Sequence, residues 1–249
     1  MFASQNRIKN QVKHLLDVFR KSEAAIRPHF FLTGPSGSGK TYIVSALCEE
    51  LDIPMFEVNA AQLTAEGISG NSISKALRPL REIWDKPNVI FVDEFDKLFQ
   101  RNGESTEGFR SQVQDEFLHM LESKVTSVFG EYGKYDQVRV DNTMFIFAGA
   151  FQGQDIKTLF DLQKAGMRPE FIGRVPLVFS TEPATLEELY EALPRIELFL
   201  EYCKLYPKTN KKAAAAAICE IIKEQSKKLG IGIRMLNSAT HQYFMKDIK

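Results

Sequence analysis

The sequence predicts an α/β fold in which helices cover both faces of a parallel sheet, followed by a small, mainly helical domain. Two observations predict this fold. First, short apolar runs alternate with helical patterns up to residue 180, and such alternation is typical of a buried parallel sheet because parallel neighbours need a crossover connection. Second, apolar runs typical of strands stop there, and Thr185 to Lys249 contains mainly helical patterns.

Each expected element follows from its local pattern. Apolar residues recur at three- and four-residue spacing from Arg7 to Phe19, which predicts a first helix. The later elements are expected, in chain order, as strand 29–33, helix 40–51, strand 54–59, helix 71–84, strand 88–93, helix 111–122, strand 143–149 and a last helix 233–245. We place a boundary near Glu182-Pro183, so that residues 1–182 form the large domain and residues 183–249 the small one.

Composition limits the function classes. The 249 residues carry 32 basic and 32 acidic side chains, so no global field attracts nucleic acid or an anionic membrane. No apolar run approaches the roughly 20 residues of a membrane span, and the N-terminus lacks the apolar core of a signal peptide. We therefore expect a cytoplasmic protein without a membrane partner. The 3 cysteines are scattered, which predicts neither a disulfide framework nor a zinc site.

A glycine-rich motif stands between strand 29–33 and helix 40–51. Its glycines let the backbone curl so that consecutive N–H groups face one point, and the helix that follows adds the positive end of its dipole. This is the Walker A loop of the P-loop nucleoside triphosphatases. We expect Lys40 to reach the β- and γ-phosphates of ATP and the Thr41 hydroxyl to bind Mg²⁺. The predicted ATP-binding residues are Gly34, Pro35, Ser36, Gly37, Ser38, Gly39, Lys40 and Thr41.

An acidic pair follows the predicted strand 88–93. Four apolar residues, 89–92, precede Asp93 and Glu94, and ligands of open α/β sheets bind at the carboxyl ends of the strands. We therefore predict that Asp93 holds the magnesium ion through its water shell and that Glu94 orients and polarises the attacking water. A strand followed by a solvated helix start is the alternative, and the upstream Walker A loop favours the catalytic interpretation.

With both motifs in place, the chain resembles the AAA+ ATPases and, within them, the ClpX/HslU group of protein-unfolding machines. The resemblance runs from about Phe2 to Arg234 and is carried by LTAEGISG (63–70), VIFVDEFDKL (89–98), VRVDNTMFIFAGAF (138–151) and GMRPEFIGRVPLVF (166–179). It implies an enzyme that converts ATP and water to ADP and phosphate. It also implies self-assembly into a ring, expected to be a hexamer.

The resemblance implies roles for two arginines. Arg174 matches the arginine finger, which reaches into the neighbouring subunit and neutralises charge developing on the γ-phosphate. A surface ion pair is the alternative for Arg174. Residues 230–234 resemble the sensor-2 turn, which implies that Arg234 contacts the nucleotide of its own subunit.

The chain departs from the family pattern at a loop and at a sensor. The segment that matches the first pore loop, residues 67–70, reads Gly-Ile-Ser-Gly and lacks the aromatic residue that grips a threaded chain. The resemblance also implies a polar sensor residue after strand 143–149, and the identity of this residue stays open. Gly149 and Ala150 fill its place, and only Thr143 and Gln152 are polar neighbours.

Two further departures concern partners. Nothing precedes the ATPase module, so we expect no zinc-binding adaptor domain. The stretch between Phe151 and Arg168 is too short for the loop with which ClpX docks on its peptidase. This argues against a peptidase partner.

Three functions stay open from the sequence. The leading one is an ATP-driven protein remodeller that contacts a protein client through loops 67–70 and 101–110. The second is a nucleic-acid-associated AAA+ factor, such as a loader or a replication or transposition accessory protein. Its candidate contacts are Lys124, Lys134, Arg139 and the lysines of 208–212. The third is a nucleotide-gated switch that assembles but hydrolyses little ATP.

Overall fold

The computed structural model describes residues 3–64, 71–99, 104–226 and 232–246. Contacts divide the chain into two compact units, which are described separately. The sheet unit consists of Ile8–Gly34 and Lys40–Ser180. The helical unit consists of Met1–Arg7, Pro35–Gly39 and Thr181–Lys249. Because the start of the chain and the Walker A loop group with the C-terminal part, the units interleave along the sequence, and the predicted domain boundary at 182 stays a prediction.

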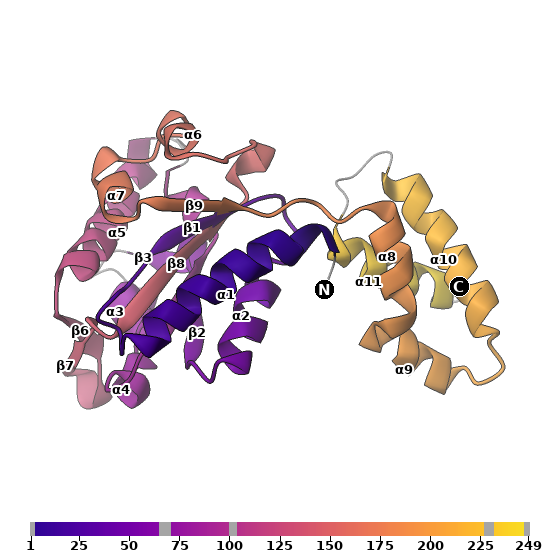
Figure 1. The fold of residues 1–249 in the computed structure, drawn as a ribbon, viewed down its shortest axis with the longest axis horizontal. Helices are drawn as coiled ribbons and strands as arrows, with labels where there is room; N and C mark the ends of the chain where they lie inside the picture. Colours follow the sequence, from indigo (N-terminus) through magenta and orange to yellow (C-terminus); the bar gives the residue numbers. More distant parts are fainter. Residues whose placement is uncertain (1–2, 65–70, 100–103, 227–231, 247–249) are drawn as a thin grey trace. The chain divides into compact units, whose positions relative to one another are not determined.

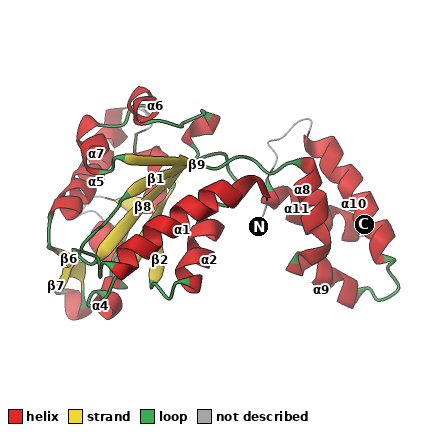
Figure 2. Cartoon of the chain, viewed as in Figure 1, coloured by secondary structure: helices red, strands yellow, loops and turns green. Residues whose placement is uncertain are grey.

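A parallel sheet forms the centre of the sheet unit, as predicted (Figure 1 and Figure 2). Its strands are fully buried at β1 and β8 and almost fully at β5, which explains why they read as continuous apolar runs. The five strands lie in the order β2-β5-β8-β1-β9. Their bounds are Phe30–Thr33 (β1), Met55–Asn59 (β2), Asn88–Asp93 (β5), Thr143–Gly149 (β8) and Leu177–Ser180 (β9).

Helices cover both faces of this sheet (Figure 1). On one face, α1 (Asn6–Lys21) and α2 (Lys40–Glu50) bury apolar side chains against β1 and β5. The other face is covered by α5 (Glu104–Glu122) and α7 (Pro169–Arg174), with α6 (Leu159–Lys164) beside them. The short turns η2 (Ala60–Gln62), η3 (Phe95–Leu98) and η5 (Phe151–Gly153) follow the carboxyl ends of strands. The predicted P-loop fold class is thereby confirmed.

The single helix predicted over 71–84 is wrong. The structure has a short strand β4 (Asn71–Ser72), which pairs with β3 (Leu63–Thr64), and two short helices, α3 (Ile73–Ala76) and α4 (Leu80–Ile83). Pro79 explains the break, because proline has no N–H to donate within a helix and disfavours helical geometry in the residue before it. Apolar spacing alone gave no warning of this break.

The sequence also predicts two polar, Gly-containing insertions, residues 103–108 and 130–135, and the structure differs from simple loops at both places. Helix α5 begins at Glu104 and not at residue 111, so most of the predicted loop 101–110 is helical, and 100–103 lie outside the described residues. The insertion 130–135 is the turn, including η4 (Glu131–Gly133), of an unpredicted antiparallel hairpin of β6 (Val125–Phe129) and β7 (Tyr135–Arg139).

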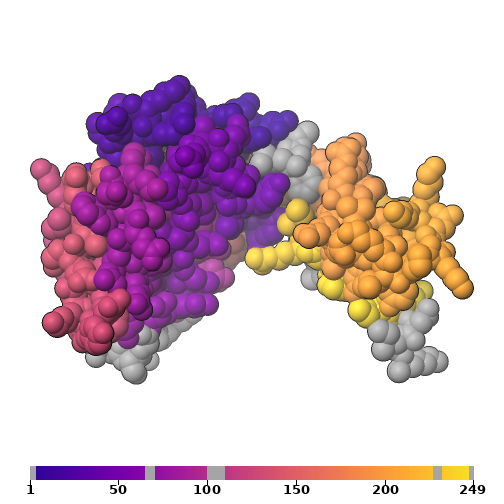
Figure 3. All heavy atoms as spheres, turned by 90° about the horizontal axis from the view of Figure 1, so that it is seen from below, coloured from indigo at the N-terminus to yellow at the C-terminus, as the bar shows by residue number. Residues whose placement is uncertain are grey.

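The β6–β7 hairpin lies against α3 and α4 at the surface of the sheet unit (Figure 3). Arg81 Nε is 2.8 Å from Asp136 Oδ2, and Lys75 Nζ stands 5.6 Å from the centre of the Phe129 ring. The inward side chains Val128 and Val138 are buried. These contacts attach the hairpin to the rest of the unit.

The C-terminal part of the helical unit is mainly helical, as predicted. Its helices are α8 (Leu186–Ala192), α9 (Glu197–Leu205), α10 (Lys211–Ser226) and α11 (Ile233–Phe244), with turn η6 (Leu193–Arg195) after α8 and turn η1 (Ala3–Gln5) from the start of the chain. Leu189, Phe199, Ile218 and Leu236, one from each helix, are buried in one apolar core. None of the helices in the described part of the chain is both long and apolar enough to span a bilayer.

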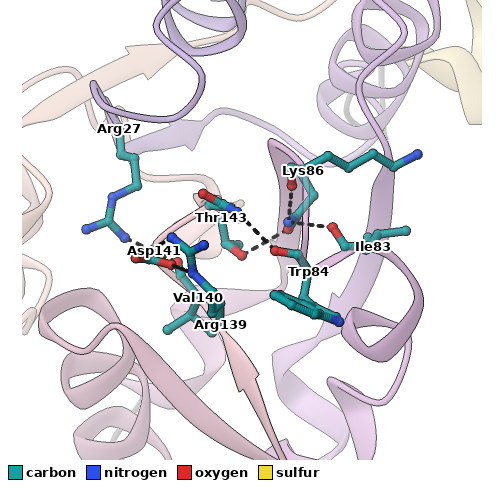
Figure 4. A network of polar contacts seen from close by, with 10 residues as sticks. Arg27, Ile83, Trp84, Lys86, Arg139, Val140, Asp141 and Thr143 are labelled. Atoms are coloured by element: carbon teal, nitrogen blue, oxygen red, sulfur yellow. Dashed lines mark hydrogen bonds and ion pairs between the residues drawn. The ribbon is translucent and has the colours of Figure 1, made fainter.

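Asn88, the first residue of β5, connects the starts of two strands through contacts with Ile83, Lys86 and Thr143, which are labelled in Figure 4. Its side-chain amide donates to Ile83 O at 3.2 Å and to Lys86 O at 2.9 Å, while its Oδ1 accepts from Thr143 Oγ1 at 3.0 Å. Asn88 and Thr143 are both fully buried. Buried polar groups need such partners, so this network ties the loop before β5 to the start of β8.

His29 supports the neighbouring strand by accepting a backbone hydrogen bond. Its Nδ1 accepts from Phe145 N at 3.0 Å, and the ring is buried. Burial, together with the nearby charge of Arg27, lowers the pKa of His29 from 6.5 to about 3. The folded protein therefore requires the neutral ring.

The stability of the sheet unit should decrease as the pH is lowered, because His29 is protonated more readily in the unfolded chain than in the folded chain. The unfolded chain binds this proton near pH 6.5 and the folded chain only near pH 3, so acidification favours the unfolded state across that window. Between pH 7 and pH 5 the free energy of unfolding should fall by about 2 kcal/mol more in the natural chain than in His29→Gln, whose amide oxygen accepts the same bond without titrating. Urea unfolding followed by fluorescence of Trp84, the single tryptophan, measures the difference.

His14→Gln is the matched control, because it removes an exposed histidine from α1 without touching the contact to Phe145. Equal pH dependence in the natural chain and in His29→Gln would contradict the assignment.

Candidate functional site

Three glycines give the Walker A loop backbone conformations that other residues rarely adopt. Gly34, Gly37 and Gly39 have φ angles of 129°, 77° and 83°, a region that favours glycine because it has no Cβ. The loop joins the carboxyl end of β1 to the first residue of α2. Its curvature therefore depends on these three glycines.

Lys40 and Thr41 begin α2 in the sheet unit. Lys40 is 9% exposed, and its Nζ donates to Gly34 O at 2.8 Å. The ammonium group thus lies at the base of the loop, next to the backbone of the first residue of the motif. Thr41 is half-buried in the first helical turn.

Within the helical unit, the interior of the Walker A loop contacts the start of α11. Arg234 Nη1 donates to Ser36 Oγ at 2.9 Å, and Ile233 N donates to Gly37 O at 3.1 Å. A Cβ on Gly232 would lie 3.1 Å from both Ser36 O and Gly37 O, so a larger residue would crowd this approach. The structure thus brings Arg234 to the predicted ATP-binding loop, while residues 230–231 of the predicted sensor-2 turn lie outside the described residues.

Two buried residues that the sequence interpretation missed also contact this loop. The side-chain amide of Gln5 donates to Ser38 O, and Thr181 Oγ1 lies 2.6 Å from Ser38 Oγ. No local motif marks either residue, because they lie 33 and 143 positions away from Ser38 in the chain. Only tertiary structure reveals them.

The acidic pair stands at the carboxyl end of β5, as predicted. Asp93 is the last residue of the strand, and its Oδ1 accepts from Glu94 N at 2.8 Å. Glu94 has φ 54° and ψ 29°, a left-handed conformation that costs a non-glycine residue about 1–2 kcal/mol. The next residue, Phe95, is fully buried. This places a strained residue at the predicted catalytic position, which is where backbone strain is commonly retained.

The residues present fit a magnesium ion that is shared with a nucleotide. In the described part of the chain, no cluster of three or more His, Cys, Asp or Glu side chains is placed to bind a metal by itself. Mg²⁺ commonly keeps waters and phosphate oxygens and takes only one or two protein oxygens. The Thr41 hydroxyl and the Asp93 carboxylate are ligands of this kind, and both belong to the sheet unit.

A polar cavity of about 430 Å³ adjoins Asp93 and includes Glu57 and Asn59 of β2 in its lining. Asn59 is the register partner of Asp93. Partial loss of hydration, and secondarily the Asp93 carboxylate, raises the pKa of Glu57 above its usual value. Negative charge is therefore concentrated beside Asp93, which favours a cation there.

Asp96 is a further buried acid near the acidic pair. It is 4% exposed, and its Oδ2 accepts from Phe151 N at 3.1 Å. A Cβ on Gly149 would lie 2.7 Å from Asp96 Oδ1, so glycine is required at that position. Asp96 thus joins the turn after β5 to the turn after β8. The third acid of the Asp-Glu-Phe-Asp string, residues 93–96, was the available sequence signal.

The two polar neighbours considered for the open sensor role lie at opposite ends of β8. Thr143 begins the strand and bonds to Asn88. Gln152 follows the carboxyl end with φ 56°, next to Phe151 with φ 46°. Gln152 and Asp96 line one cavity of about 390 Å³. Of the two, only Gln152 is at the edge where ligands of parallel sheets bind.

Arg174 is the last residue of α7 and is half-buried. Its Nη1 donates to Glu170 O at 3.1 Å, and its Nη2 forms an ion pair with Glu122 of α5. The ion pair considered as an alternative to the finger is therefore present within the chain. Glu122 holds the guanidinium at the surface of the sheet unit, where such pairs contribute little to stability.

The residues proposed to contact a protein client or nucleic acid belong to different elements of the chain. Loop 67–70 lies outside the described residues. Arg139 donates two hydrogen bonds to Asp141, at 2.8 and 2.9 Å, so its charge is neutralised. Lys134 lies in the hairpin turn, and Lys124 directly precedes β6. The lysines of 208–212 belong to the other unit, where Lys211 begins α10.

Comparison with known proteins agrees with this geometry. One curated relative, the "ATP-dependent Clp protease ATP-binding subunit ClpX 2" of Wolinella succinogenes, is 29% identical, and the match covers 72% of this chain and 55% of the relative. The chain thus spans about half the length of that protein. Residues 30–163, more than half of the chain, match the ATPase family associated with various cellular activities (AAA) and include the Walker A loop and the acidic pair. The chain therefore belongs to the AAA family of ATPases.

Proposed function

We propose that this chain is an ATP-hydrolysing motor of the ClpX/HslU group that works as a homo-oligomeric ring, with a hexamer expected, and remodels proteins. The Walker A loop carries the proposal, because its three glycines have φ angles that let consecutive N–H groups turn toward one anion and because Lys40 begins the helix that follows. Membership of the AAA family and similarity to a ClpX protein support it.

Phosphate binding follows from the backbone of the loop and the helix behind it. Consecutive N–H groups and the positive end of the α2 dipole attract an anion, and Lys40 adds a full charge. Thr41 and Asp93 would hold Mg²⁺, which neutralises charge on the phosphates when it is bound. Arg234, exposed and bonded to Ser36, would contact the nucleotide from the helical unit.

Hydrolysis needs a group that orients water. We assign this role to Glu94, because it directly follows Asp93, the proposed metal ligand, and because the buried Phe95 holds the chain on its other side. A carboxylate that accepts a hydrogen bond from water raises the nucleophilicity of the water oxygen. The left-handed backbone at Glu94 sets the direction in which its side chain leaves the strand.

Glu94→Gln should separate binding from hydrolysis. The amide keeps the size of the side chain but cannot accept a proton, so kcat should fall by about 100-fold or more while ATP affinity stays close to that of the natural chain. Phosphate release and equilibrium binding of a fluorescent ATP analogue measure the two quantities. Lys40→Ala is the control that should lose binding itself. A hydrolysis rate unaffected by Glu94→Gln would instead support a nucleotide-gated switch.

Arg174 is proposed to act on the ATP of the neighbouring subunit. A guanidinium is always charged and presents a planar fork of donors that suits phosphate oxygens. In the ring, the Arg174 fork would leave Glu122 for the phosphate, and the weak surface pair makes this exchange inexpensive.

Mixing two inactive variants tests this role. Arg174→Ala and Glu94→Gln should each lower kcat strongly, by about 10³-fold for the arginine. Mixed rings should regain hydrolysis, because an Arg174→Ala subunit keeps Glu94 and can receive Arg174 from a Glu94→Gln neighbour. ATPase rate against mixing ratio is the measurement. Absence of any recovery would argue against a finger supplied by a neighbour.

Arg168→Ala is the matched control. Arg168 flanks the same helix, and its side chain is 34% exposed against 33% for Arg174. It also pairs with an acid of α5, Asp115, at 2.6 Å. This variant should retain most of the ATPase activity.

A protein client is proposed rather than nucleic acid, because the chain has no net charge and Arg139 is already neutralised. Loop 67–70 and the start of α5 are the proposed contact region, and the cytoplasm is the proposed location. An unfolded polypeptide should raise the ATPase rate of the ring, whereas single- and double-stranded DNA should not. Stimulation by DNA that falls steeply with salt would move the protein to the nucleic-acid class.

A further inference from the structure

Three buried polar side chains meet at one residue of the Walker A loop, and all belong to the helical unit. Gln5, Ser38 and Thr181 are 2%, 1% and 2% exposed. The Gln5 amide donates to Ser38 O, and the hydroxyl groups of Ser38 and Thr181 lie 2.6 Å apart. Burying polar groups is costly unless they bond to one another. These contacts therefore hold Ser38 in this position.

The direction of a carbonyl fixes the direction of the next N–H. In a planar trans peptide the C=O of one residue and the N–H of the following residue point to opposite sides. Because Gln5 binds Ser38 O from one side, the N–H of Gly39 points to the other side. Gly37 O, which accepts from Ile233 N at 3.1 Å, orients the preceding peptide in the same manner, and the N–H of Ser38 donates to Pro35 O at 3.3 Å within the loop.

The position of Gln5 is itself fixed by its neighbour. Ser4 N donates to Glu188 Oε1 at 2.7 Å, and Ser4 Oγ donates to Glu188 Oε2 at 2.8 Å. Glu188 also accepts from Thr185 N at 2.9 Å in the capping box of α8. The residue before Gln5 is thus anchored to α8, the first helix after Thr181.

We propose that Gln5 and Thr181 are positioning residues for the polyphosphate chain of the nucleotide. They hold Ser38 from behind so that the N–H of Gly39 faces the phosphates. Without the Gln5 donor, the Ser38–Gly39 peptide is free to turn its carbonyl oxygen toward the anion, which weakens binding. This inference rests on the proposed ATP site and assigns these residues to the phosphates rather than to the base.

Inorganic tripolyphosphate with Mg²⁺ is the probe, because it can bind to the phosphate loop but has no base or ribose. It competes against a fluorescent ADP analogue. In Gln5→Met, which keeps the length of the side chain but removes the donor, the affinities for tripolyphosphate and for ATP should fall in parallel, by about 3- to 10-fold.

Two results would overturn the proposal. If ATP affinity falls and tripolyphosphate affinity does not, Gln5 serves the base or ribose; if neither falls, Gln5 has no positioning role. Binding of ATP and of tripolyphosphate to the natural chain tests the proposed function separately from this inference. Failure of the natural chain to bind either ligand would reject the ATP site itself, and the inference with it.

Thr181 gives an independent test that does not depend on Gln5→Met folding. Thr181→Val removes the hydroxyl at nearly constant volume and should lower tripolyphosphate affinity a few-fold, whereas Thr181→Ser should restore it. Combining Thr181→Val with Ser38→Ala should cost no more than Ser38→Ala alone, because residues that share one contact are not additive. Full additivity would show that the Thr181 hydroxyl does not act through Ser38.

Thr240→Val is the matched control for Thr181→Val. Thr240 is a fully buried threonine of α11 whose Oγ1 donates to Leu236 O at 2.7 Å. The substitution makes the same chemical change in the same unit without touching the loop. It should leave tripolyphosphate affinity unchanged. An equal loss of affinity in both variants would show that the Thr181 effect is a general loss of packing.

Discussion

The burial of Phe95 is the constraint on which the proposed catalytic edge of the sheet unit depends. Its ring lies 4.4 Å from that of Phe147 in β8, 5.8 Å from Phe117 in α5 and 5.2 Å from Phe171 in α7, measured between centroids. Aromatic pairs at these separations contribute beyond the area that they bury. Because Phe95 directly follows Glu94, this packing fixes the chain where it leaves β5 and offsets the strain of the left-handed Glu94.

The same packing connects the acidic pair to other parts of the proposed site. Phe147 belongs to the strand that leads into the turn at Phe151, to which Asp96 is bonded. Phe171 lies one turn before Arg174 on α7. A substitution that disturbed the aromatic cluster would therefore move the proposed catalytic residue, the turn after β8 and the proposed finger together. Cores transmit such shifts because they are closely packed.

Much of the sheet unit was readable from the sequence because its strands are buried on both faces and appear as continuous apolar runs. The β6–β7 hairpin was not predicted, because only two of its inward side chains, Val128 and Val138, are buried apolar residues. The Walker A loop and the acidic pair were readable because their chemistry is local. The conformation of Glu94 was not, since it depends on the packing of a neighbour and not on residue type.

Directional bonds, and not apolar packing, support the phosphate loop from behind. Apolar contacts stabilise a position but do not orient a peptide plane, whereas a hydrogen bond to a carbonyl does both. Recognition of a phosphate depends on where the N–H groups point, so a loop held only by apolar side chains would lose affinity whenever one peptide turned. The hydrogen bonds of Gln5 and Ile233 to successive carbonyls remove that freedom. Their partners are distant in the chain, which is why a motif can mark the loop without revealing what orients it.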